Sequence, residues 1–227
     1  MDLRVLKTVL MLPKINRVET AILFCVVLLS ACTQHPKNTL PYYNTPDFSP
    51  IWANEEKVGI DTLHTIAPFS FTNQNGQEVS NKTLEGKIYA ANFFFTTCGS
   101  ICPKMTNNLQ AVADSFAGNE HVNIVSYSVT PQTDNVATLK HYEEQNNING
   151  KQWQLLTGDA SKIYTLARKS YFAEEEPGYN KDSTEFLHTE HCILVDKKGH
   201  IRGVYNATIK LEIKRLIEDI GILLKEE

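Results

Sequence analysis

The chain has 227 residues, which leaves room for one domain once its two ends are discounted. Its formal net charge at pH 7 is −4, and residues 1–31 contribute four basic and two acidic side chains, so the rest of the chain carries −6. This acidic balance, with no basic stripe, excludes nucleic acid as an expected partner.

The first 31 residues have the pattern of a secretory signal peptide. Basic residues precede an apolar run at residues 21–29, which is shorter than the roughly 20 residues that cross a bilayer. Residues 29–32, Leu-Ser-Ala-Cys, resemble a bacterial lipobox, in which Cys32 is lipidated and becomes the mature N-terminus. An uncleaved signal anchor with a chance cysteine is the alternative. In either case we expect a domain tethered to the cell membrane and facing the periplasm.

Residues 32–54 contain four prolines and little apolar periodicity, which predicts a Pro-rich, extended tether. The folded domain is then predicted to cover residues 55–227. Three cysteines remain in it, Cys98, Cys102 and Cys192. Outside the cytoplasm an odd number leaves at least one thiol unpaired in a monomer. These cysteines are therefore not simply a structural framework.

The predicted domain alternates strands and helices. A strand at residues 67–72 and a turn at 73–76 start an N-terminal β-hairpin, and the nearly apolar residues 87–95 fit a strand buried on both faces. Further strands are predicted at residues 122–129, 153–156, 192–196 and 201–205, and helices at 101–116, 134–142, 159–167 and 209–223. This order predicts an α/β, thioredoxin-like domain: a central, mostly parallel sheet with a C-terminal β-hairpin and helix.

Cys98 and Cys102 follow the buried strand, at the edge of the sheet where ligands gather in α/β folds. Pro103 suits the first position of the next helix, which would place Cys102 at its cap, where free backbone N–H groups stabilise thiolates.

A structural disulfide, a catalytic dithiol and a soft-metal site all fit such a pair. A disulfide that closes a loop of five residues gives little stabilisation. Redox thioredoxins have two residues between their cysteines and a cis-proline opposite, whereas this chain has three and no proline after Pro177. The soft-metal site is favoured, since a histidine can occupy the space opposite the thiolates.

Residues 92–105, Asn-Phe-Phe-Phe-Thr-Thr-Cys-Gly-Ser-Ile-Cys-Pro-Lys-Met, resemble the Cx3CP signature of the SCO/SenC family. His188, followed by a threonine and then by the strand and Asp-containing turn at residues 193–199, is similar to that family's distal histidine. The resemblance extends to the C-terminus. It implies a protein that delivers copper to the binuclear copper centre of cytochrome oxidase, with Cys98, Cys102 and His188 as the copper ligands.

Two thiolates and one imidazole suit copper, because thiolate selects Cu(I) and imidazole also serves Cu(II). His191 is the alternative to His188, although strand alternation would place it on the opposite face. We expect Cys192 to be a small buried hydrophobe. Many family members have Val-Asp-Pro after the third strand, where residues 129–131 here are Val-Thr-Pro. Asp134 is then the candidate acidic neighbour of the site.

The expected function is that of a membrane-anchored copper metallochaperone whose partner is the apo-cytochrome oxidase copper-site subunit. Copper would pass to that subunit by ligand exchange. Two alternatives use the same residues: a thiol–disulfide reductase that keeps the copper-binding cysteines of the oxidase reduced, and a copper or redox sensor. The histidine distinguishes the chaperone from the reductase, because a reductase does not require it.

Overall fold

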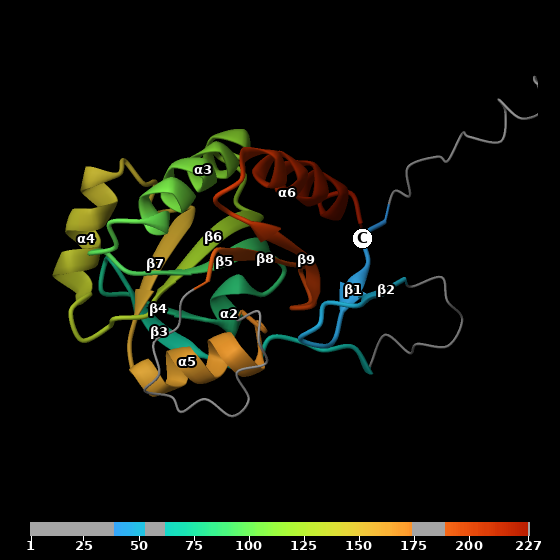
Figure 1. Cartoon of the computed structure of the whole chain (residues 1–227), viewed down its shortest axis with the longest axis horizontal. Helices are drawn as coiled ribbons and strands as arrows, with labels where there is room; N and C mark the ends of the chain where they lie inside the picture. The colour runs from blue at the N-terminus through green and yellow to red at the C-terminus, as the bar shows by residue number, and fades with distance from the viewer. Residues whose placement is uncertain (1–38, 53–61, 174–188, 227) are drawn as a thin grey trace, which may run out of the picture. The chain divides into compact units, whose positions relative to one another are not determined.

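The computed structural model describes residues 39–52, 62–173 and 189–226, which form a nine-stranded sheet flanked by helices (Figure 1). The strand order is β2-β1-β9-β8-β5-β6-β7-β3-β4. The strands are β1 (Tyr42–Tyr43), β2 (Pro50–Ile51), β3 (Ser70–Asn73), β4 (Glu78–Ser80), β5 (Ile88–Phe94), β6 (Val122–Ser128), β7 (Trp153–Thr157), β8 (His191–Val195) and β9 (Ile201–Asn206). The helices are α2 (Asn81–Leu84), α3 (Ile101–Ser115), α4 (Val136–Gln145), α5 (Ala160–Lys169) and α6 (Lys210–Leu223).

The centre of the sheet is parallel and buried, as the apolar runs of the sequence predict. β5, β6 and β7 are parallel, and every residue of β5 and β6 is buried. The C-terminal hairpin of β8 and β9 adds antiparallel strands on the other side of β5. The N-terminal hairpin of β3 and β4 pairs with β7 at the far edge. The predicted thioredoxin-like α/β fold is confirmed.

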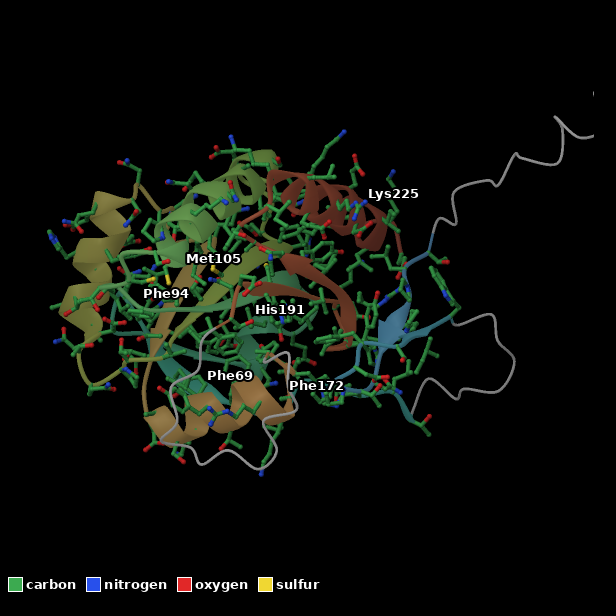
Figure 2. The ribbon with its side chains drawn as sticks, viewed as in Figure 1. Phe69, Phe94, Met105, Phe172, His191 and Lys225 are labelled. Carbon is green, nitrogen blue, oxygen red and sulfur yellow. The ribbon has the colours of Figure 1, made fainter. Side chains whose placement is uncertain are left out.

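Helices cover both faces of this sheet (Figure 1). α3, α4 and α6 pack on one face, and α2 and α5 pack on the other. Because neighbouring residues of a strand point to opposite faces, Phe93 and Phe94 of β5 belong to different hydrophobic clusters. Figure 2 shows Phe94 and Met105 on the α3 side, and Phe69 and Phe172 on the α5 side. None of the helices within the described ranges is long and apolar enough to cross a membrane.

The folded part begins earlier than the sequence predicts. Residues 39–52, within the predicted tether, form β1 and β2, and Tyr43 continues the sheet beyond β9. Proline suggested an extended linker, but Pro50 lies in β2, the outermost strand on that side. The missing N–H of proline is tolerated at such an edge.

Arg202 in β9 explains why this segment is held on the domain. Its guanidinium donates to the backbone oxygens of Leu40 and Pro41, at 2.8 and 3.1 Å, and lies 4.0 Å from the ring centroid of Tyr42. The same guanidinium pairs with Glu226 beyond α6, with a shortest distance of 2.8 Å. A buried arginine thus joins the N-terminal segment, the C-terminal hairpin and the end of the chain. The contacts with Leu40 and Pro41 join residues that are 162 and 161 positions apart, so no local pattern predicts them.

Candidate metal centre

The carboxyl ends of β5, β6 and β9 and the start of β8 lie together at one end of the strands of the sheet. β5 ends at Phe94, which pairs with Ser128 at the end of β6. β8 runs antiparallel to β5 and begins at His191, which pairs with Asn206 at the end of β9. The loop from β5 to α3 leaves from this end and carries Cys98. The predicted strand-to-helix junction is therefore present.

Cys98 and Cys102 lie next to each other at this junction. The N–H of Cys98 donates to the backbone oxygen of Phe95 at 3.2 Å, which closes a tight turn after β5. The N–H of Cys102 donates to the Cys98 sulfur at 3.5 Å. Both thiols are free, with exposed fractions of only 8% and 4%. Two adjacent reduced sulfurs of this kind can bind a soft metal ion or form a disulfide.

The helix after the cysteines begins earlier than Pro103 suggests. Ser100 is the N-cap of α3 and Ile101 is its first residue, so Pro103 occupies the third position. The first four N–H groups of a helix have no partner within it, so a proline at the third position removes no helical hydrogen bond. Cys102 consequently lies inside the first turn, and its own N–H is the one that faces the Cys98 sulfur.

The two thiols differ in acidity. Burial opposes ionisation of Cys98, yet hydrogen bonds from the Cys102 thiol and from the backbone N–H groups of residues 100–102 lower the pKa of Cys98 below its usual value. Burial, followed by the hydrogen bond to Cys98, raises the pKa of Cys102 to about 12. The helix start therefore favours one thiolate, at Cys98, rather than both as the sequence suggested.

Asp134 lies beside this junction with no exposed surface. Its Oδ1 accepts a hydrogen bond from the Thr96 hydroxyl at 2.5 Å, and its Oδ2 accepts one from the Thr96 N–H at 3.2 Å. The hydroxyls of Ser128 and Thr130 donate to Oδ2 at 2.6 and 3.0 Å. The acidic neighbour suggested by the sequence is thus joined to the turn that carries Cys98.

Tyr142 of α4 also lies near the two cysteines, and no sequence motif singles it out. Its hydroxyl lies 2.8 Å from that of Thr106, one helical turn after Cys102, and its ring centroid lies 5.3 Å from that of Phe94. Burial raises the pKa of this phenol, and the charges of Cys102, Cys98 and Asp134 raise it further. Only the packing of α4 against α3 reveals this proximity.

Only one of the two candidate histidines, His191, lies within the described residues. His188, the expected third ligand, lies outside the described residues, as does Cys32. His191 begins β8, and its ring packs edge-on against Phe48 with centroids 6.1 Å apart. Strand alternation directs His191 away from the face that Cys192 shares with Cys98 and Cys102.

The described residues therefore contain two of the three expected ligands, and no three of their His, Cys, Asp or Glu side chains are placed so that they could hold a metal ion together. Cys192 is fully buried, and burial raises the pKa of its thiol to about 12. Its environment is that of a small hydrophobic side chain.

A mixed sheet with helices on both faces, and a pair of cysteines between a buried strand and a helix, define a thioredoxin-like protein with a thiol site. The chain belongs to the SCO1/SenC family, whose model matches residues 58–225.

Solved structures of Sco proteins are similar to this chain over most of their length. BsSco, a member of the Sco family of cytochrome c oxidase assembly proteins in which a disulfide switch was identified, is 30% identical, with a TM-score of 0.62 over 72% of this chain and 95% of BsSco. A SCO1/SenC family lipoprotein from Bacillus anthracis is 28% identical, with a TM-score of 0.60 over 71% of this chain and 96% of that chain. Bradyrhizobium japonicum ScoI, solved with copper bound, is 27% identical, with a TM-score of 0.55 over 70% of this chain and 99% of that chain.

Proposed function

We propose that this protein is a copper metallochaperone, which binds copper at Cys98 and Cys102 and passes it to the apo-cytochrome oxidase copper-site subunit. The observation that carries the proposal is the pair of reduced, adjacent sulfurs at the edge of the sheet. Copper in the related ScoI structure, and the assembly role of the Sco family to which BsSco belongs, support it.

His188 completes the proposed ligand set. An imidazole adds a nitrogen donor to the two soft sulfurs, so that the site can hold either Cu(I) or Cu(II). It also binds and releases a metal without changing its own charge, which suits a site that must open to a client. The orientation of His191 against Phe48 favours His188 over His191 as this ligand.

A thiol–disulfide reductase is the second candidate, and the unequal acidity of the two thiols favours it. Cys98, with its lowered pKa, has the character of an attacking thiol, and Cys102, with its raised pKa, has that of a resolving thiol. The disulfide switch of BsSco supports the same chemistry. Both activities are compatible, because a dithiol that has released copper is free to oxidise. A copper or redox sensor would use the same residues.

The proposal includes a membrane anchor at Cys32. The relative from Bacillus anthracis is a lipoprotein, which supports this assignment. Because residues 39–52 fold onto the domain, the proposed tether would be limited to the residues between Cys32 and residue 39. The domain would then be held close to the membrane surface, facing the periplasm.

Replacing His188 separates the chaperone from the reductase. His188→Ala, with both cysteines intact, is expected to fail in oxidase assembly at low copper, while its reduction of disulfides in vitro largely survives. His191→Ala is the matched control and should support assembly, because its ring faces Phe48. Full assembly by His188→Ala, with its copper binding shown to be lost, would make the reductase the better description.

A further inference from the structure

Asp134 is a buried acid whose position is not explained by packing alone. Burying a carboxylate costs several kcal/mol unless hydrogen bonds or a cation satisfy it. Among the described residues, hydroxyl and amide donors satisfy Asp134, and no cation does. Two of the four hydrogen bonds that its carboxylate accepts come from a single residue, Thr96, which is 38 positions earlier in the sequence.

Thr96 is the middle of the turn that presents Cys98. The backbone oxygen of Phe95 accepts the N–H of Cys98, so residues 95–98 form one hydrogen-bonded turn. Asp134 binds both the N–H and the hydroxyl of Thr96 inside this turn. Because one buried carboxylate binds both the N–H and the hydroxyl of Thr96, the turn cannot change its conformation without breaking two charge-assisted hydrogen bonds.

We propose that Asp134 is a positioning residue for copper binding: by holding the N–H and the hydroxyl of Thr96, it fixes the turn from which Cys98 directs its sulfur at the metal. Asp134 is not itself a ligand. The inference rests on the proposed function, in that Cys98 and Cys102 are taken to bind copper. Groups that orient metal ligands in this way matter, since losing one commonly weakens metal binding about 10- to 100-fold.

Two single substitutions test whether Asp134 positions the turn that carries Cys98 or whether its hydrogen bonds only stabilise a buried carboxylate. Thr96→Val keeps the shape of the side chain and removes the hydroxyl that bonds to Oδ1 at 2.5 Å. Ser128→Ala removes a hydroxyl that bonds to Oδ2 at 2.6 Å, from the end of β6 rather than from the cysteine turn. Ser128 also accepts the N–H of Thr130, so Ser128→Ala removes at least as many contacts. Thr96→Ser, which restores a hydroxyl, is the rescue variant.

The full chain of each variant is reduced and titrated with Cu(I) against a competing chelator, and with Cu(II) while the thiolate-to-copper absorption band is recorded. Thr96→Val should bind Cu(I) about tenfold more weakly than the wild type and shift the absorption band. Thr96→Ser should recover both, and Ser128→Ala should behave like the wild type. Asp134→Asn should lose more than Thr96→Val, provided that circular dichroism shows it to be folded. Equal effects of Thr96→Val and Ser128→Ala, or no effect of Thr96→Val, would overturn the inference.

A measurement without copper tests the role of Asp134 independently of the proposed copper-binding function. In the reduced protein without copper, the rate at which a small reagent alkylates Cys98 should change in Thr96→Val and not in Ser128→Ala. If Cys98→Ser and Cys102→Ser both leave copper binding intact, the proposed function is wrong. The alkylation rates of Cys98 would still show whether Asp134 positions the cysteine turn. If copper binding needs both cysteines but Thr96→Val alters neither readout, the positioning role alone is rejected.

Discussion

The sulfur of Cys98 accepts a hydrogen bond from the backbone N–H of Cys102, 3.5 Å away in the first turn of α3. This contact, together with the neighbouring N–H groups, makes the two thiols unequal. The pKa of Cys98 is lowered, whereas burial raises that of Cys102 to about 12. A copper ion that replaces both protons would remove this difference.

The difference in pKa between Cys98 and Cys102 predicts which thiol is alkylated first in the reduced, metal-free protein. At about pH 7.5, near the usual range for thiol titration, iodoacetamide should modify Cys98 well before Cys102. The rate at Cys98 should rise as the pH passes its lowered pKa, while Cys102 should stay slow until strongly alkaline pH. Peptide mass spectrometry gives the rates, with fully buried Cys192 as the internal control. Faster modification of Cys102 than of Cys98 would refute this assignment.

The distal histidine can be identified from the spectrum of the Cu(II) form. His188→Ala should change the absorption and electron paramagnetic resonance spectra and weaken Cu(II) binding, because a nitrogen donor is lost. His191→Ala should leave both spectra unchanged, because β8 directs this side chain towards Phe48 and away from the thiols. A larger effect of His191→Ala would show that the wrong histidine has been assigned.

Arg202→Ala should detach the segment of residues 39–52 and destabilise the domain. The arginine is buried and pairs with Glu226 and Asp196, and removing one partner of a buried ion pair costs about 3–5 kcal/mol. Urea unfolding measures this loss, and limited proteolysis should show faster cleavage within residues 39–52. Arg215→Ala is the control, since Arg215 forms an exposed pair with Glu212 that contributes at most about 1 kcal/mol. Equal stability of the two variants would refute the role given to Arg202.

The lowered pKa of Asp196 leads us to expect that the free energy of unfolding falls at acid pH. Burial raises its pKa, but hydrogen bonds from the side chain and backbone N–H of His200, the charge of His200 and the N–H of Lys198 lower it, and the net pKa lies below the usual value. A group with a lowered pKa in the folded state stabilises the protein above its unfolded pKa, and this stabilisation is lost as the pH falls through the folded value. Wild-type stability should therefore decline below about pH 4. Asp196→Asn should be less stable at neutral pH and show a flatter acid limb in urea unfolding; an unchanged acid limb would contradict the prediction.

Local patterns of the sequence predict much of this fold. The apolar run at residues 87–95 and the helical periodicity after Cys102 correspond to β5 and α3, because burial on both faces of a strand and on one side of a helix leaves a direct record in the sequence. The location of the two cysteines between a strand end and a helix start is predicted for the same reason, although Cys102 lies in the first turn of α3 and not at its cap.

Contacts between distant residues could not be predicted in this way. The docking of residues 39–52 depends on Arg202, and the fixed turn at Thr96 depends on Asp134. Neither partner is marked by a periodic pattern. The difference in acidity between the thiols depends on which backbone N–H groups face Cys98, and this follows from the start of α3 at Ile101 rather than at Pro103.

An anaerobic titration with Cu(I) decides whether Cys98 and Cys102 together hold copper. The reduced protein is titrated with Cu(I) in the presence of a competing chelator, alongside Cys98→Ser, Cys102→Ser and Cys192→Ala. We predict that the wild type and Cys192→Ala each take up one copper ion tightly, because Cys192 is buried in the hydrophobic cluster, and that each serine variant loses this binding. Tight binding that survives in both serine variants, or that is lost in Cys192→Ala with its fold intact, would show that Cys98 and Cys102 do not form the copper site.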